Sequence, residues 1–146
     1  VSIIGTGKER VLIEDFLEKN GGGIEVKMLG DVPNERVGEL YRSSHIFALP
    51  TRWEGFPMTI IEAMSYGLPV IASDVGGIKE AIGDGAGVLM KKGEEVSIMQ
   101  NFFGKVIENP NFLLQIKEKE KERVSKEFSS EVMCEKVFAV YDELIK

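Results

Sequence analysis

Short runs of β-branched and aliphatic residues alternate along this chain with longer segments of helical period, and this alternation limits the folds open to it. The short runs predict strands at residues 1–4, 24–29, 46–49, 69–72 and 88–90. The segments between them predict helices at residues 9–19, 34–42, 57–66 and 78–82. Strands that alternate with helices are typical of repeated β-α units. We therefore predict an α/β fold with a mostly parallel sheet and helices on both of its faces.

The length of the chain suits one domain with a helical tail. Its 146 residues, 43% of them hydrophobic, can bury one sizeable core, so we predict a single domain over residues 1–146. After Gly93 the pattern predicts helices alone, which makes residues 94–146 the tail. Breaks are expected at Asn109-Pro110 and at Ser129-Ser130, where a serine can cap the next helix. Val1 already lies inside an apolar run, which suggests a piece of a longer polypeptide.

Two predicted helices carry apolar stripes, and a third segment is highly charged. Helix 9–19 should pack on the sheet through Val11, Leu12, Phe16 and Leu17. The last helix should dock on this domain or on a neighbouring one through Met133, Val137, Val140, Tyr141 and Leu144. By contrast, the mixed charges of residues 117–126 predict a solvated helix face.

Charge and composition exclude several classes of partner. The formal net charge of −6 opposes broad contact with phosphate backbones, so we expect no nucleic-acid partner. The longest apolar runs are only a few residues, far below the roughly 20 that cross a bilayer, so we expect no transmembrane segment. Cys134 is the one cysteine, and no secretory leader pattern is visible, so we expect a reducing, cytoplasmic setting.

The stretch EGFPMTIIE, residues 54–62, places two carboxylates around the start of a predicted helix. Pro57 suits the first helical position, and Gly67 suits the position just past the helix end. The buried stripe of this helix should consist of Ile60, Ile61, Met64 and Leu68. Glu62 then lies beside the stripe, and Glu54 precedes the helix. A pair of hydrolytic carboxylates is compatible with this spacing but is not implied by it.

The loop before this helix follows a predicted parallel strand, and ligands bind at that edge of open α/β sheets. The amides of Phe56, Met58 and Thr59 should form a partly positive pole suited to a phosphate. Glu62 could accept hydrogen bonds from the vicinal hydroxyls of a ribose. These residues together predict a nucleotide site. Surface acids that frame an ordinary β-α turn remain the alternative.

A much longer string around this stretch resembles a known family. The pattern Glu-Gly-Phe-Pro-x4-Glu-Ala-Met-x2-Gly-x-Pro-Val-Ile-Ala, over residues 54–72, is similar to the donor-binding signature of retaining glycosyltransferases of the Glu-x7-Glu family, or group 1, which have the GT-B fold. The likeness continues through Leu49-Pro50-Thr51, Ser73-Asp74-Val75-Gly76-Gly77, Ile3-Ile4-Gly5-Thr6-Gly7 and Gly30-Asp31-Val32. It covers roughly residues 3–90. The implied fold is Rossmann-like, the C-terminal half of a GT-B protein.

The resemblance implies a role for each matching residue. Glu62 would hold the ribose, and the amides of Met58 and Thr59 would meet the pyrophosphate. Glu54 would act as the catalytic residue, by orienting the sugar or stabilising charge at its anomeric carbon, and Gly55 and Phe56 would contact the sugar beside it.

Two further positions lie upstream. The backbone near Val32 would lie beside the base, and Gly5 would either allow the backbone to approach the ligand closely or serve turn geometry alone. The substrate would be a UDP-, GDP- or ADP-sugar, with no cofactor and no metal. Reaction with retention is implied, in which the leaving phosphate helps to deprotonate the acceptor.

The family's phosphate-binding Arg and Lys, and its acceptor-binding N-terminal domain, precede the region that this sequence covers. We expect that domain as a partner, with any membrane contact made through it at the inner face. Lys8, Arg10 and Arg52 are predicted to be surface residues. His45 is predicted to lie at a helix end or in the core.

Other functions stay open on the sequence alone. The chain could be a binding or regulatory module that keeps the fold without catalysis and completes a site with a partner chain. A nucleotide-sugar epimerase would fit the crevice but not the detailed string. The segment Gly5-Thr6-Gly7 lacks the third glycine of a dinucleotide fingerprint, so an NAD site is poorly supported.

Overall fold

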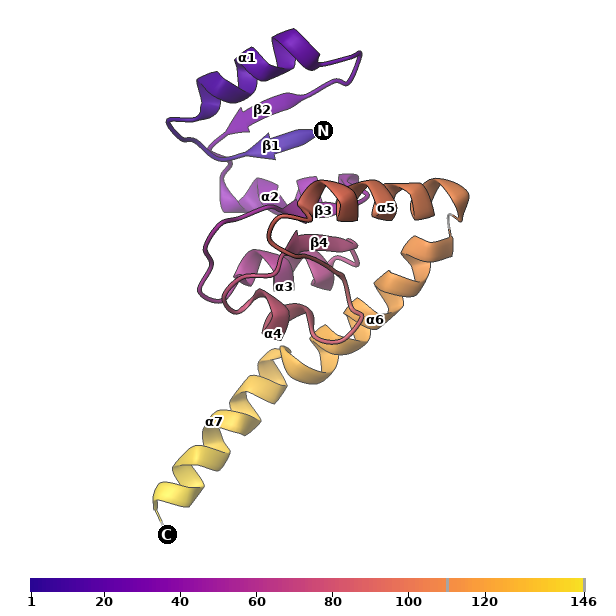
Figure 1. Ribbon diagram of the computed structural model, residues 1–146. Coiled ribbons are helices and arrows are strands. Elements are labelled where there is room, and N and C mark those ends of the chain that lie inside the picture. The colour runs from indigo at the N-terminus through magenta and orange to yellow at the C-terminus, as the bar shows by residue number, and fades with distance from the viewer. Residues whose placement is uncertain (110, 146) are drawn as a thin grey trace. The chain divides into compact units, whose positions relative to one another are not determined.

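The computed structural model describes residues 1–109 and 111–145 and divides the chain into two compact units, residues 1–40 and 41–146 (Figure 1). The elements follow in the order β1 Ser2–Ile4, α1 Arg10–Asn20, β2 Lys27–Gly30, α2 Asn34–Ser43, β3 Phe47–Leu49, α3 Met58–Ser65, β4 Val70–Ser73, α4 Ile78–Ile82, β5 Val88–Met90, α5 Glu95–Glu108, α6 Asn111–Glu127 and α7 Ser130–Leu144. Pro110, within the predicted break at Asn109-Pro110, lies outside the described residues.

The unit of residues 1–40 is built on a two-stranded sheet in which β1 and β2 run parallel. The register shifts between Ile3 and Ile4, and the Gly5 amide then donates to the carbonyl oxygen of Gly30 at 2.8 Å. No residue of this unit is buried, although the structure describes every one of them. Two short strands leave too little surface to enclose a core.

The apolar face of helix α1 is not buried, although we expected it to pack on the sheet. Val11, Leu12 and Phe16 are 69%, 64% and 62% exposed, and only Leu17 of the predicted set is half-buried. The periodicity identifies residues that share a helix face, but two strands of three and four residues cannot cover that face.

The unit of residues 41–146 holds a three-stranded parallel sheet in the order β3-β4-β5, which confirms the predicted α/β class. Strand β4 is central and fully buried, as its unbroken apolar run Val70-Ile71-Ala72 requires. Helices α3 and α4 connect the strands. The predicted stripe of α3 is confirmed, with exposures of 7% or less at Ile60, Ile61, Met64 and Leu68.

The ends of α3 follow local backbone rules closely. Gly67 has φ +68°, the left-handed conformation expected of a glycine just past a helix end. Pro57, predicted at the first helical position, is instead the N-cap residue, and α3 begins at Met58. The ψ of 88° at Pro57 is outside the helical range, so the helix starts one residue later.

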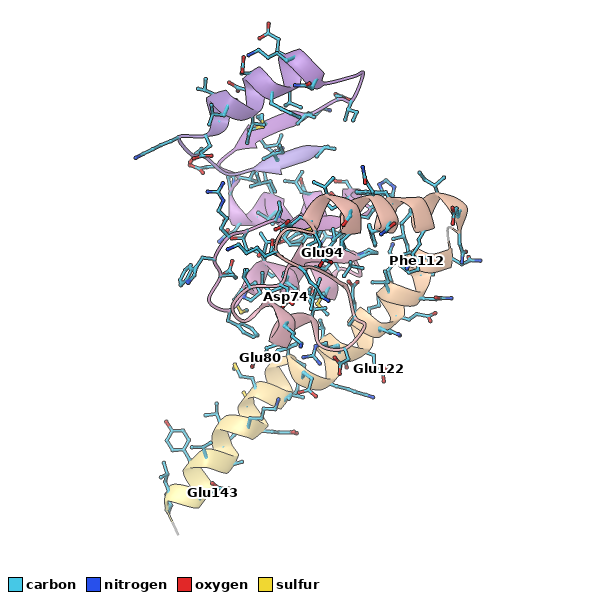
Figure 2. The ribbon with its side chains drawn as sticks, viewed as in Figure 1. Asp74, Glu80, Glu94, Phe112, Glu122 and Glu143 are labelled. Carbon is cyan, nitrogen blue, oxygen red and sulfur yellow. The ribbon has the colours of Figure 1, made fainter. Side chains whose placement is uncertain are left out.

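Helix α6 packs on this sheet through residues of the segment that we predicted to be a solvated face. That prediction is wrong for Glu120, which is fully buried and accepts a hydrogen bond from the Val70 amide at 2.8 Å through Oε1. Arg123 donates to the carbonyl oxygens of Ala81, at 2.8 Å, and Glu80. Figure 2 labels Glu80 on α4 and Glu122 on the exposed side of α6. A charged run thus contains the residues that attach the helix to β4 and α4.

Helix α7 begins at the predicted cap but leaves its apolar stripe uncovered. The Ser129 hydroxyl oxygen accepts a hydrogen bond from the Val132 amide, which confirms the expected cap. The stripe is 48% to 77% exposed at every predicted position, so it does not dock on the described part of this unit. Figure 1 shows α7 running on from the end of α6, away from the sheet of the same unit. In the described residues, no helix is long and apolar enough to cross a membrane.

Candidate functional site

The loop between β3 and α3, residues 50–57, carries the first part of the candidate site. The Thr51 hydroxyl donates to the carbonyl oxygen of Trp53 at 2.8 Å, which forms a tight turn closed by a side chain. This turn leaves the Trp53 indole 81% exposed. Trp53 immediately precedes Glu54, so an exposed aromatic ring borders the predicted catalytic residue.

Glu54 is half-buried, and its carboxylate bends back onto the loop. Its Oε1 accepts a hydrogen bond from the Gly55 amide at 3.1 Å. The carbonyl oxygen of Gly55 accepts in turn from the Gly77 amide at 2.8 Å. Gly77 is the N-cap residue of α4, so the loop after β3 is hydrogen-bonded to the start of the helix after β4. Both ends of this contact lie at the carboxyl edge of the parallel sheet.

The first turn of α3 presents the predicted phosphate-binding amides. The Met58 amide donates to the carbonyl oxygen of Phe56 at 3.1 Å, so a phosphate would compete with this contact. Thr59 is the second residue of the helix, where an amide has no acceptor within the helix itself. Both side chains are exposed. The partly positive pole expected at a helix start is therefore present beside the loop.

Glu62 lies on the exposed side of α3 and is held by a residue that the sequence did not single out. The Tyr41 hydroxyl donates to Glu62 Oε2 at 3.3 Å and lies 3.4 Å from the carbonyl oxygen of Thr59. Burial, followed by the nearby Glu62 charge, raises the pKa of Tyr41 to about 12. The hydroxyl therefore stays protonated and donates to the carboxylate. Tyr41 is a buried aromatic residue with a polar tip, the type that usually finds a hydrogen-bond partner.

The remaining two predicted site residues belong to the unit of residues 1–40. Gly5 has φ +116°, which favours glycine, and no atom lies within 4 Å of where its side chain would begin. Val32 is half-buried and lines a small pocket of about 160 Å³, together with Leu29, Asp31, Pro33, Arg36, Glu39 and Leu40. Val32, the predicted base position, therefore borders this pocket.

The structure brings six of the predicted residues together on the β3–α3 unit: Glu54, Gly55, Phe56, Met58, Thr59 and Glu62. The candidate cations are surface residues as predicted, since Lys8 and Arg52 are exposed and Arg10 pairs with Glu14 at 2.7 Å.

His45 is exposed just beyond the end of α2, which fits a helix end and not the core. Among residues 1–109 and 111–145, no group of three or more His, Cys, Asp and Glu side chains could hold a metal ion.

Comparison with known proteins identifies the family. Residues 1–123 match the family model described as glycosyl transferases group 1, which covers most of the chain and includes every candidate site residue. The chain belongs to this family. The Glu-x7-Glu stretch on β3–α3 is therefore part of a group 1 glycosyltransferase domain.

An individual relative agrees with this assignment. A glycosyltransferase of Methanocaldococcus jannaschii whose function is uncharacterized is 33% identical over 142 residues, which are 97% of this chain and 40% of the relative. The chain thus spans well under half of that relative's length.

Solved structures share the fold. Sucrose-phosphate synthase from Thermosynechococcus elongatus matches with a TM-score of 0.80 and 24% identity, over 99% of this chain and 38% of that one. Anabaena HepE in complex with UDP-glucose matches with a TM-score of 0.81 and 22% identity, over 97% of this chain and 40% of that one. These likenesses show that this group 1 domain shares the fold of the matching part of GT-B glycosyltransferases.

Proposed function

We propose that this chain is the donor-binding domain of a retaining glycosyltransferase that moves a sugar from a nucleotide-sugar to an acceptor. The observation that carries the proposal is the Glu54–Glu62 stretch, which lies at the carboxyl edge of a parallel sheet in a group 1 glycosyltransferase domain. Anabaena HepE, which shares the fold, has been solved with UDP-glucose. A UDP-, GDP- or ADP-sugar is the corresponding substrate here, with no cofactor and no metal.

The nucleotide side of the proposed site is α3. Glu62 would accept hydrogen bonds from the ribose hydroxyls, and the amides of Met58 and Thr59 would meet the pyrophosphate. The hydrogen bond from Tyr41 orients the Glu62 carboxylate without neutralising it, so its remaining lone pairs can serve the ribose. In the unit of residues 1–40, Gly5 and Val32 would meet the donor through their backbone.

The sugar side of the proposed site is the loop before α3. Gly55 and Phe56 would contact the transferred sugar, and Glu54 would stabilise the positive charge that develops at its anomeric carbon. The bond from the anomeric carbon to the diphosphate oxygen breaks, and the diphosphate leaves with the electron pair. The acceptor hydroxyl forms the new bond on the same face and gives its proton to the departing phosphate.

The proposal assigns the acceptor to a partner domain. Because the chain spans 40% of the length of its M. jannaschii relative, we propose that an N-terminal domain of the full-length protein binds the acceptor. We also propose a cytoplasmic location, since Cys134 is the one cysteine of the chain and cannot form a disulfide within it. Contact with the inner face of the membrane would be made by the N-terminal domain.

Calorimetric titration of the full-length protein with UDP, GDP and ADP and with their sugar conjugates tests the proposal. The protein should bind nucleotides of one base in preference to the others. Glu62→Ala should lower the affinity for the preferred nucleotide by roughly tenfold or more, since hydrogen bonds to a charged acceptor contribute about 1.5–3 kcal/mol. Glu118→Ala is the matched control, because Glu118 is an exposed acid on α6.

Each outcome has a distinct meaning. Loss of affinity in Glu62→Ala but not in Glu118→Ala supports the nucleotide site. If the folded full-length protein binds none of the six compounds, the proposed donor site is wrong. Equal affinity in the wild type and Glu62→Ala would remove Glu62 from the site.

A further inference from the structure

The loop Glu54–Phe56 rests directly on two glycines at the start of α4. A side-chain carbon at Gly77 would lie 2.4 Å from the carbonyl oxygen of Gly55, and one at Gly76 would lie 1.8 Å from the carbonyl oxygen of Glu54. Both distances are too short for real contacts and involve backbone atoms. Any residue larger than glycine at these positions must therefore change the spacing between the loop and the start of α4.

An aromatic ring supports the same loop from the end of α6. The rings of Phe56 and Phe128 have centroids 5.9 Å apart, inclined at 54°. The guanidinium of Arg123 lies 5.4 Å from the centre of the Phe128 ring and is itself hydrogen-bonded to the carbonyl oxygens of Ala81 and Glu80. Helices α4 and α6 thus fix the ring against which Phe56 packs.

We propose that Gly77 and Phe128 are positioning residues that hold the loop Glu54–Phe56 in the conformation that recognises the donor sugar. This inference rests on the function proposed above, in which the loop meets the sugar and α3 binds the nucleotide. Neither positioning residue needs to touch the donor. Displacement of the loop should weaken recognition of the sugar and leave recognition of the nucleoside diphosphate intact.

Gly77 is the more informative of the two glycines. Its φ of −78° and ψ of 4° are accessible to any residue, so Gly77→Ala changes only the space between the loop and α4. Gly76 has φ +53°, so a substitution there would add backbone strain. Gly104, in α5, offers a matched control, because a side-chain carbon there would have no atom within 4 Å.

The experiment measures the dissociation constants of UDP, GDP and ADP and of UDP-glucose, GDP-mannose and ADP-glucose for the full-length protein and its variants. For the preferred base, Gly77→Ala should raise the dissociation constant of the sugar conjugate by roughly tenfold. The dissociation constant of the nucleoside diphosphate should change by less than about twofold. Phe128→Leu should act in the same direction by about two- to fivefold, since the smaller side chain leaves Phe56 less confined.

Two control variants accompany these measurements. Gly104→Ala and Phe138→Leu, the latter on the exposed surface of α7, should leave both constants unchanged. The inference is overturned if Gly77→Ala leaves the dissociation constant of the sugar conjugate unchanged, or if it raises the dissociation constants of both ligands equally. Neither result would contradict the proposed donor site. If the wild type binds none of the six compounds, the proposed function itself fails. If circular dichroism shows that Gly77→Ala does not fold, Phe128→Leu decides by the same criterion.

Discussion

Helices α6 and α7 follow one another in the chain, yet only the more highly charged of the two is packed. Helix α6 buries Ile116 and Glu120 against the sheet of its unit. Helix α7 has a continuous apolar stripe but no buried residue, and its Val137 and Leu144 are 48% and 77% exposed. The comparison teaches that a charged residue can hold a helix in place when it forms a hydrogen bond with a backbone donor or acceptor of another element. An apolar stripe, by contrast, does not hold a helix in place unless another surface packs against it.

The buried carboxylate of α6 explains how this attachment works. Glu120 Oε1 completes the hydrogen bonding of the Val70 amide at the start of β4, where an unsatisfied buried donor would be costly. Its Oε2 is buried and has no hydrogen-bond partner among the described residues. Burial outweighs the nearby Lys117 charge and the Val70 hydrogen bond and raises the pKa of Glu120 to about 8.

The largest expected effect comes from removal of this carboxyl group. Glu120→Ala should lower the free energy of unfolding by about 2–4 kcal/mol, because it leaves the Val70 amide unsatisfied and opens a cavity. Urea denaturation of the 146-residue chain, followed by circular dichroism, measures the change. Glu118→Ala, on the exposed face of α6, should stay within about 0.5 kcal/mol of the wild type. Equal stability of the two variants would contradict the role of Glu120.

The pH dependence of stability sharpens the comparison further. The folded chain holds the Glu120 proton up to about pH 8, whereas the free side chain has a pKa of 4.5. The contribution of this protonation to the free energy of unfolding is therefore complete below pH 4.5 and is lost as the pH rises through about 8. The slope can reach about 1.4 kcal/mol per pH unit. Urea denaturation from pH 5 to pH 9 should show this decline in the wild type and a flatter profile in Glu120→Gln. Parallel profiles would show that Glu120 is ionised when folded.

A smaller effect is expected at the second attachment of α6. Arg123→Ala removes the hydrogen bonds to the carbonyl oxygens of Ala81 and Glu80 and should cost about 1 kcal/mol. Thermal unfolding of the same chain can detect the shift in Tm. Lys119→Ala serves as the control, because Lys119 is an exposed residue of the same helix. If both variants melt together, the contact between α4 and α6 does not contribute to stability.

The smallest effect is expected on α7. Val140 is 57% exposed, so Val140→Ala should change the free energy of unfolding of this chain by less than about 0.5 kcal/mol. A loss above about 1 kcal/mol in the same urea experiment would contradict an uncovered stripe. The same substitution in the full-length protein would then report whether another part of the polypeptide covers α7.

Local pattern was sufficient to predict most of the elements. The bounds predicted for α4 and β5 agree with the structure, and the apolar stripe of α3 is buried as expected. These elements depend on neighbours in sequence, on glycine at turns and on the period of apolar residues. The failure at α1 has a different origin, since a stripe at helical spacing does not reveal how much sheet surface faces it.

The inward face of α6 did leave a signal in the sequence. Glu120 and Arg123 follow Ile116 at i+4 and i+7, so all three share one helix face with a buried aliphatic residue. A charged residue in register with an apolar stripe is a candidate for a buried contact. The charge run as a whole hides this signal, because Glu118, Lys119, Lys121 and Glu122 beside these two residues are exposed.

The candidate site divides in the same way. Glu54 and Glu62 were predicted from one contiguous stretch, and the structure brings that stretch to the sheet edge. Tyr41 was not predicted, because its partner Glu62 is 21 residues away in sequence. Phe128 was missed for the same reason, since only the folded chain brings α6 to the loop before α3. Residues that hold a site from a distance carry no local signature.

Trp53 gives this loop a built-in optical label. It is the one tryptophan among the 146 residues, and its indole is 81% exposed, next to Glu54. Indole emission responds to the polarity around the ring, so the tryptophan fluorescence of this chain originates next to the proposed sugar site. Movement of the loop can therefore be followed by light, without a chemical dye and without knowledge of the acceptor.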